Sequence, residues 1–231
     1  MKCLILASGF GTRLYPLTLN QAKPLLPYRG KPMINHILDK IPADIDVLVN
    51  VNKKFEADFE AWRKQQKRDI TLCVEEVYSD EQKLGAVGAL NYWIIQKGIR
   101  EDLMVMGSDN YFEFDIHRFL KAYNNENVIV AVHDIGDPAR ATQYGVVRLE
   151  GNKIIELEEK PAAPKSSLVS TACYIIPPRV FWIIAEYCLS TRRDNLGSFI
   201  SYLIEKDMVY AFPFKECWID IGNLEVYNAT R

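Results

Sequence analysis

The chain has 231 residues, with 28 Lys and Arg against 30 Asp and Glu, a formal net charge of −2, and 48% hydrophobic and 25% charged residues. These are the proportions of an ordinary folded protein and argue against intrinsic disorder. The nearly neutral charge excludes the broad electrostatic surface with which proteins bind nucleic acid or an acidic membrane, so any bound anion must be held by a local site.

Cysteine usage and the lack of long apolar runs predict a cytoplasmic protein. The five cysteines are scattered and form no C-x-x-C pair, which favours free thiols in a reducing compartment over disulfides or structural zinc. The apolar run Cys3–Ala7 is too short for a signal peptide or a membrane span. No other uncharged run reaches the roughly 18 residues that a membrane helix needs.

Through about residue 135, short apolar runs alternate with amphipathic segments, as strands alternate with helices. Pro32 suits a first helical residue, and Asp115 suits the cap of a helix running to about Tyr123. This alternation predicts a doubly wound, mostly parallel sheet. The expected strands are Lys2–Ala7, Val47–Val51, Ile70–Val74, Leu103–Met106 and Val128–Val132; the other expected helices are Met33–Ile41, one carrying Phe55, Phe59 and Trp62, and one carrying Val87, Leu90 and Ile94 that stops at Gly98.

The pattern changes at about residue 144, where strands follow one another around the turn Glu150-Gly151-Asn152. Antiparallel strands are therefore expected to join the parallel sheet within one α/β domain, residues 1–231, whose halves are about 1–135 and about 136–231. The expected strands are Tyr144–Leu149, Lys153–Glu158, Leu168–Ile176 and Val209–Phe214, and the expected helices are Phe181–Leu189 and Ser198–Glu205.

A glycine-rich turn follows the first strand, at Ser8-Gly9-Phe10-Gly11-Thr12-Arg13-Leu14. Its two glycines let backbone N–H groups approach a phosphate chain, and Arg13 adds a guanidinium suited to phosphate oxygens. Lys23, in the long loop that follows, would add a second cation. The motif is neither a dinucleotide fingerprint nor a Walker A loop. The alternative is a plain glycine turn followed by a solvated lysine.

Two aspartates are candidates for holding a metal ion. Asp109 follows a buried strand, and Asp220 lies in the apolar stretch Trp218-Ile219-Asp220-Ile221. Carboxylates at strand ends suit Mg²⁺, which prefers oxygen ligands and phosphate partners. Either residue could instead be a turn residue or a helix cap. The histidines are scattered, so neither a zinc site nor a Ser-His-Asp triad is expected.

Several segments together resemble the sugar-1-phosphate nucleotidylyltransferases. Leu6 to Thr18 followed by Lys23-Pro24-Leu25-Leu26-Pro27 is similar to the signature of that family. Further motifs follow in the same order as in the family: Leu84-Gly85-Ala86-Val87-Gly88, Gly107-Ser108-Asp109-Asn110, Tyr144-Gly145-Val146-Val147, Glu158-Glu159-Lys160-Pro161, Ser170-Thr171-Ala172-Cys173-Tyr174 and Trp218-Ile219-Asp220-Ile221-Gly222.

The resemblance implies a Rossmann-like nucleotide-diphospho-sugar transferase fold and the reaction of an NTP with a sugar 1-phosphate to give an NDP-sugar and pyrophosphate, with Mg²⁺. The catalytic residues implied are Arg13, Lys23, Asp109, Lys160 and Asp220, of which Asp109 and Asp220 hold the metal. The nucleotide is expected on Leu6, Ala7, Ser8, Gly9, Phe10, Gly11, Thr12, Arg13, Lys23, Leu84, Gly85, Gly88 and Asp109, and the sugar phosphate on Asn110, Gly145, Glu159, Lys160 and Thr171.

The chain departs from longer relatives in two respects. The turn Leu84-Gly85-Ala86-Val87-Gly88 lacks the glutamine with which thymidylyl-type members read a pyrimidine, so the base stays open. The chain ends soon after Asn223, without the extensions of longer relatives, and a minimal monomeric or homodimeric enzyme is expected. The alternatives are a cytidylyltransferase for a phosphate such as phosphocholine and an inactive regulatory subunit that binds a nucleotide sugar.

Overall fold

The chain folds into two compact units in the computed structural model, which describes residues 1–189 and 195–231. Unit 1 consists of Met1–Lys83, Met106–Glu113 and Cys217–Arg231, and unit 2 of Leu84–Val105 and Phe114–Glu216. Strand β6 (Leu103–Gly107) begins in unit 2 and ends in unit 1. The single domain with halves divided near residue 135 stays a prediction, and the observed units draw on segments out of sequence order.

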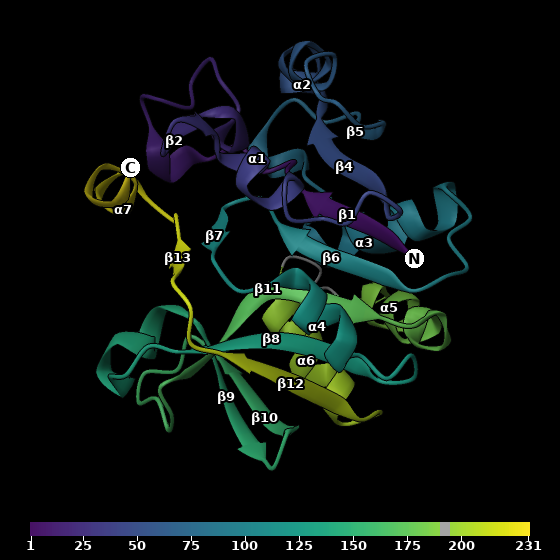
Figure 1. The fold of residues 1–231 in the computed structure, drawn as a ribbon, viewed down its shortest axis with the longest axis vertical. Helices are drawn as coiled ribbons and strands as arrows, with labels where there is room; N and C mark the ends of the chain where they lie inside the picture. Colours follow the sequence, from purple (N-terminus) through teal and green to yellow (C-terminus); the bar gives the residue numbers. More distant parts are fainter. Residues whose placement is uncertain (190–194) are drawn as a thin grey trace. The chain divides into compact units, whose positions relative to one another are not determined.

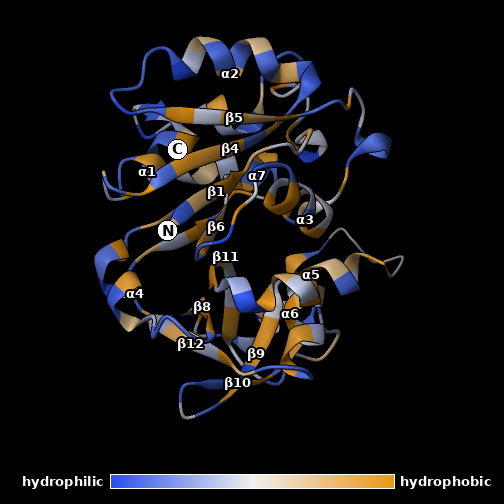
Figure 2. Ribbon diagram, turned by 90° about the vertical axis from the view of Figure 1, so that its right-hand side faces the viewer, coloured by the Kyte–Doolittle hydropathy of each residue, from blue (hydrophilic) through white to orange (hydrophobic). Residues whose placement is uncertain are grey.

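Unit 1 is built on parallel strands in the order β5-β4-β1. The apolar runs of β1 and β4 are largely buried, as parallel strands require, and Figure 2 shows both mostly in the hydrophobic colour. The edge strand β5 buries Ile70, Cys73 and Glu75 and is only partly covered elsewhere. Helix α2 buries Phe59 and Trp62 and turns its charged residues outward. The expected strands and helices are confirmed here as β1 (Lys2–Leu6), β4 (Asp46–Asn52), β5 (Ile70–Glu75), α1 (Met33–Leu38) and α2 (Glu56–Arg63).

Short elements that the sequence did not predict complete unit 1. Strands β2 (Pro27–Tyr28) and β3 (Lys31–Pro32) form a hairpin, so Pro32 ends a strand just before α1 and is not itself helical. Strand β7 (Asn110–Phe112) pairs antiparallel with β13 (Trp218–Asp220), and α7 (Leu224–Thr230) follows β13. Figure 1 shows β13 and α7 in yellow. Strands of two or three residues are too short to show a hydrophobic period.

Unit 2 contains a mixed sheet in the order β11-β8-β12-β10-β9. Strand β12 runs parallel to β8, and the other pairs are antiparallel, which confirms that antiparallel strands join the sheet. Asp115 caps α4 through the N–H of His117, as expected. The elements are α3 (Ala86–Gln96), α4 (Ile116–Ala122), β8 (Val128–Asp134), β9 (Gly145–Glu150), β10 (Lys153–Glu159), β11 (Leu168–Ile176), α5 (Phe181–Cys188), α6 (Leu196–Ile204) and β12 (Val209–Phe214).

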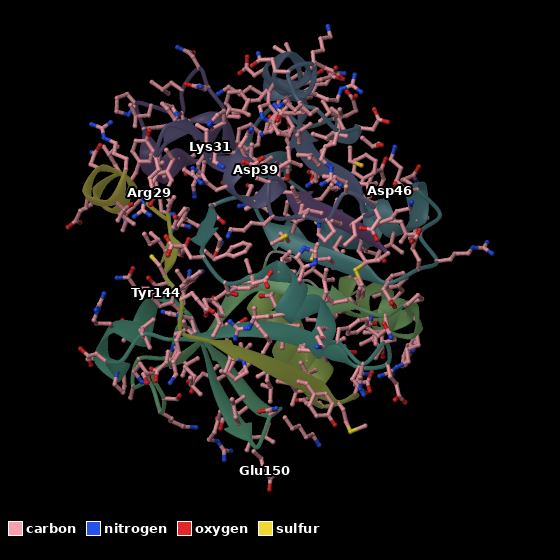
Figure 3. The ribbon with its side chains drawn as sticks, in the orientation of Figure 1. Arg29, Lys31, Asp39, Asp46, Tyr144 and Glu150 are labelled. Carbon is pink, nitrogen blue, oxygen red and sulfur yellow. The ribbon has the colours of Figure 1, made fainter. Side chains whose placement is uncertain are left out.

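Figure 3 labels Glu150 at the turn between β9 and β10, at the position where the sequence predicts a hairpin turn. Among the described residues, no helix combines the length and the apolar character needed to cross a bilayer.

A small hydrophobic cluster in unit 1 joins segments from both ends of the chain. Its buried members are Leu14, Leu26, Tyr28, Met33, Ile221 and Tyr227. Arg29, labelled in Figure 3, donates from Nε to the carbonyl of Thr230 at 3.2 Å and stacks on the ring of Tyr111. Because Leu14 follows Arg13 and Ile221 follows Asp220, this cluster fixes the backbone beside two candidate site residues.

We expect Tyr28→Phe to raise the free energy of unfolding by about 1 kcal/mol, because the buried Tyr28 hydroxyl has no hydrogen-bond partner among the described residues. Tyr227→Phe is the matched control: its hydroxyl donates to the carbonyl of Pro27 at 2.6 Å, so removal should cost about 1 kcal/mol. Urea denaturation measures both changes. A loss of stability in Tyr28→Phe would contradict this account.

Candidate active site

A cavity of about 330 Å³ in unit 1 brings together the glycine turn, Lys23 and Asp109. Its volume lies at the lower end of the usual range for small-molecule sites. Asp80 and Lys83 also line it, and the sequence analysis did not identify them. The lining residues are Leu6, Gly9, Phe10, Gly11, Thr12, Arg13, Leu14, Lys23, Pro24, Asp80, Lys83, Ser108, Asp109 and Gly222.

The backbone N–H groups of residues 9–13 are available to a ligand. Within residues 1–189 and 195–231, none of them donates a hydrogen bond, and the next donors in the chain are Leu14 and Tyr15, which bond to Gly11 and Thr12. Phe10 is buried, whereas Gly9, Thr12 and Arg13 are exposed, so the N–H groups of this segment can bond to water or to a ligand in the adjacent cavity. The Arg13 side chain is exposed and makes no ion pair within the described residues.

Gly11 is required by the fold of this loop. Its φ of 63° lies in the left-handed region, and a Cβ there would lie 3.0 Å from Cβ of Lys23 and 3.1 Å from Cγ2 of Thr18. The Thr18 hydroxyl donates to the carbonyl of Gly11 at 2.7 Å. This packing brings the long loop back onto the glycine turn and carries Lys23 with it. A Cβ at Gly9, by contrast, would meet nothing within 4 Å.

Lys23 and Asp109 form an ion pair, with Nζ 3.0 Å from Oδ2. The lysine side chain is 11% exposed and the aspartate side chain 41%, so the carboxylate faces the cavity. Desolvation raises the pKa of Asp109, but the charge and hydrogen bond of Lys23, aided by the Asn110 amide, bring that pKa below its ordinary value. Asp109 is therefore a carboxylate at neutral pH and an available oxygen ligand.

Asp220 reaches the same region by a route that the sequence did not indicate. We expected a parallel sheet edge to gather the two aspartates, whereas the antiparallel pair β7–β13 sets Asp220 opposite Asn110, and the Ile221 N–H donates to the Asp109 carbonyl at 2.9 Å. A Cβ at Gly222 would lie 3.7 Å from Asp220 Oδ2 and 3.9 Å from Arg13 Nη1. The hydrophobic cluster that includes Tyr28 also contains Leu14, the neighbour of Arg13, and Ile221, the neighbour of Asp220.

The donor set fits a hard cation that keeps other oxygen ligands. No group of three or more His, Cys, Asp or Glu in the described part of the chain could hold a metal ion alone. Asp109 lies in the turn before β7 and lines the cavity, and Asp220, at the end of β13, pairs with Asn110, the residue next to Asp109. Mg²⁺ is commonly bound in this way, by one or two carboxylates together with substrate phosphates.

Unit 2 carries a second group of predicted residues around Glu159. Its carboxylate lies so close to the backbone that a Cβ at Gly145 would be 2.9 Å from Oε2, and one at Gly197 would be 2.1 Å from it. Gly197 is the second residue of α6, whose N-terminus favours a negative charge. Neither the Glu159 carboxylate nor the Lys160 amine has a hydrogen bond or ion pair among the described residues. Sequence reasoning missed Gly197, since only the fold brings it to Glu159.

The other predicted residues lie in varied settings. Leu84, Gly85 and Gly88 belong to unit 2, where Gly85 precedes α3 with a φ of 77°. Thr171 is buried, and its hydroxyl donates to the carbonyl of Ala131 at 2.8 Å. Asn110 donates to Asp109 and accepts from Trp218 Nε1 at 2.7 Å, so its amide orients the aspartate. The binding roles assigned to these residues stay predictions.

A sequence model of the family described as Nucleotidyl transferase matches residues 2–230. The chain belongs to this family. It is 31% identical over 225 residues to the bifunctional protein GlmU of Methanocaldococcus jannaschii, an alignment covering 96% of this chain and 51% of the relative. It is 32% identical over 240 residues to mannose-1-phosphate guanyltransferase of Schizosaccharomyces pombe, covering 98% and 62%. The chain thus spans about half to three fifths of the length of these curated relatives.

Solved structures share the fold. A Bacillus anthracis protein named "Putative Glucose-1-Phosphate Thymidylyltransferase", crystallised with sucrose, is 29% identical with a TM-score of 0.86, covering 100% of this chain and 93% of that one. A UDP-glucose pyrophosphorylase crystallised with UDP-glucose has a TM-score of 0.82 over 99% of this chain and 97% of the other, and at 21% identity it shows the fold alone. The nucleotide-diphospho-sugar transferase fold expected from the sequence is confirmed.

An added methyl group should affect stability at one glycine of the turn and ligand binding at the other. Gly11→Ala should lower the melting temperature by several degrees, because it needs a left-handed alanine against Lys23 and Thr18. Gly9→Ala should fold normally but weaken nucleotide binding, because its methyl group would occupy the space that a ligand needs. Thermal unfolding and calorimetric titration of NTP test this pair. Normal nucleotide affinity in a folded Gly9→Ala protein would contradict the assignment.

Proposed function

We propose that this protein is a nucleotidylyltransferase that makes an NDP-sugar and pyrophosphate from an NTP and a sugar 1-phosphate. The observation that carries the proposal is the row of N–H groups at residues 9–13, which have no acceptor in the described part of the chain and lie beside Arg13, Lys23 and Asp109. Such a site suits a polyphosphate with a bound divalent cation. Membership of the nucleotidyl transferase family supports the same reaction class.

The proposed chemistry needs no general base. A phosphate monoester already carries about 1.5 to 2 negative charges at pH 7, so an oxygen of the sugar phosphate can attack the α-phosphorus directly. One P–O bond forms as the bond from the α-phosphorus to the β-phosphate oxygen breaks, and pyrophosphate takes that electron pair. The protein must bring two anions together and stabilise the charge that develops. This accounts for a site rich in cations and backbone donors and without histidine.

Lys23 and Arg13 have distinct roles in the proposal. Lys23 is paired with Asp109 at 3.0 Å and is nearly buried, so it is preorganised to neutralise charge on the transferring phosphate. Arg13 is exposed and offers a planar guanidinium to the β- and γ-phosphates. Asp109 and Asp220 would hold Mg²⁺, which when bound neutralises phosphate charge and helps to orient the triphosphate.

The sugar phosphate is assigned to Glu159 and Lys160 in unit 2. A carboxylate that has no donor among the described residues suits sugar hydroxyl groups, which donate hydrogen bonds to it. An exposed lysine that has no partner among those residues suits a phosphate. Gly145 keeps the backbone open beside Glu159. These features favour a sugar over a choline-like acceptor, because a quaternary ammonium group is usually held by aromatic rings.

The test is release of pyrophosphate by the purified protein across the four NTPs and a panel of sugar 1-phosphates, with phosphocholine included. We expect release with at least one sugar 1-phosphate and its loss on chelation with EDTA. Asp109→Asn and Asp220→Asn should each reduce it severely, and the double variant should be little slower than either single one, because groups acting as a unit are non-additive. Release with phosphocholine alone would overturn the assignment of a sugar 1-phosphate as substrate. Losses that multiply in the double variant would overturn the assignment of a metal ion shared by the two aspartates.

Lys160→Ala and Glu159→Gln should raise the KM for sugar 1-phosphate about tenfold or more while leaving the affinity for NTP nearly unchanged, since the two sets of residues contact different substrates. Steady-state kinetics with each substrate varied in turn measures this. As a control, Lys165→Ala removes an exposed lysine of the same unit that pairs with Glu156, and it should change neither constant. Loss of NTP affinity in Lys160→Ala would show that the two substrates have been assigned to the wrong residues.

A further inference from the structure

Two asparagines near the end of β4 hold Ser8, the residue at which the glycine turn begins. Asn50 Nδ2 donates to the Ser8 hydroxyl at 2.9 Å and to Glu75 Oε1 at 2.8 Å. Asn52 Nδ2 donates to the Ser8 carbonyl at 2.9 Å. Both asparagines are completely buried and Glu75 is 3% exposed, so these hydrogen bonds are shielded from competing water.

Partners on both sides determine the orientation of the Asn52 amide. While Nδ2 donates to Ser8, Oδ1 accepts the N–H of Phe55 at 3.1 Å and caps the short helix Lys53–Phe55. A flipped amide would lose both bonds, so the donor must face Ser8. In a trans peptide the C=O and the following N–H point in opposite directions. With the Ser8 carbonyl directed at Asn52, the Gly9 N–H points away from Asn52.

The residue after Gly9 is held from the same side. Phe10 is buried, and its ring lies 6.4 Å, centroid to centroid, from that of Phe55, whose N–H is capped by Asn52. Gly9 therefore spans two anchored residues, and its own surroundings are open because it lines the cavity. Among the described residues, the bond from Asn52 is the one hydrogen bond to the Ser8–Gly9 peptide group.

We propose that Asn52, assisted by Asn50, is a positioning residue that orients the Ser8–Gly9 peptide so that the Gly9 N–H is presented to a phosphate oxygen of the nucleotide. It acts through Ser8 and does not touch the substrate. The inference rests on the proposed function, since it presumes a phosphate ligand in this cavity. It assigns to the buried end of β4 a role in nucleotide affinity beyond stabilising the fold.

Asn52→Asp and Asn52→Ser test the proposal, because each keeps an oxygen that can cap Phe55 and removes the amide donor to Ser8. We expect the KM for NTP and its calorimetric Kd to rise about tenfold, or about 1.4 kcal/mol, while kcat and the KM for sugar phosphate change by less than about threefold. Asn52→Ser introduces no charge near Glu75, so it answers the question even where Asn52→Asp folds poorly.

Asn35→Asp is the matched control. The Asn35 amide in α1 also bonds on both sides, donating to Gln66 Oε1 at 3.1 Å and accepting from Trp62 Nε1 at 2.7 Å. The Asn35→Asp variant should lower the melting temperature about as much as the Asn52 variants do, without changing the Kd for NTP. A purely structural role for Asn52 would instead lower the active fraction, and so the apparent kcat, with an unchanged KM, and that result would overturn the proposal.

The two hypotheses fail in different ways. Wild-type protein that binds NTP but releases no pyrophosphate with any acceptor would refute the proposed reaction. The calorimetric Kd for NTP of Asn52→Ser, compared with that of wild type, would then still decide the positioning role. Active wild-type protein with unchanged NTP affinity in both Asn52 variants would refute the positioning role alone. Wild-type protein that binds no NTP would refute both.

Discussion

The candidate site of unit 1 depends on a loop, residues 9–13, whose backbone N–H groups find no acceptor within residues 1–189 and 195–231. Only Thr12 and Arg13 of this segment belong to a regular element, the short 3-10 helix Thr12–Leu14. Other contacts hold it instead: Asn50 and Asn52 bind its start, Thr18 binds the Gly11 carbonyl, and burial of Leu14 fixes its end. The stability of the loop is thus drawn from its neighbours, which leaves its own donors for an anion.

The charges of the site balance locally. The formal net charge of the whole chain is only −2, and the field that attracts an anion comes from a few groups around one cavity. Lys23 and Asp109 form an ion pair at 3.0 Å, so the nearly buried lysine has a partner of opposite charge. The exposed guanidinium of Arg13 carries no such partner within the described residues. One cation is therefore preorganised and the other adaptable.

Glycines shape the two units for different physical reasons. In unit 1, Gly11 supplies a left-handed turn in close contact with Lys23 and Thr18. In unit 2, Gly145 and Gly197 have no unusual backbone angle and instead leave room for the Glu159 carboxylate. A side chain at Gly197 would displace that carboxylate from the start of α6. The motif that carries Glu159 is thus completed by a residue from a helix that the motif does not include.

The sequence by itself determined which segments along the chain form buried strands, where the glycine turn lies and which charged residues accompany it. These are local properties of hydrophobic period and residue type. Helix caps such as Asp115 were readable for the same reason. Only the tertiary structure decided that β13 pairs with β7 and so brings Asp220 to Asp109, that Gly197 lies under Glu159, and that Asn52 reaches Ser8. Each of these contacts joins residues far apart in the chain, and the strands involved in the first are too short to show a period. Local pattern therefore named the chemical groups, and long-range packing decided which of them meet.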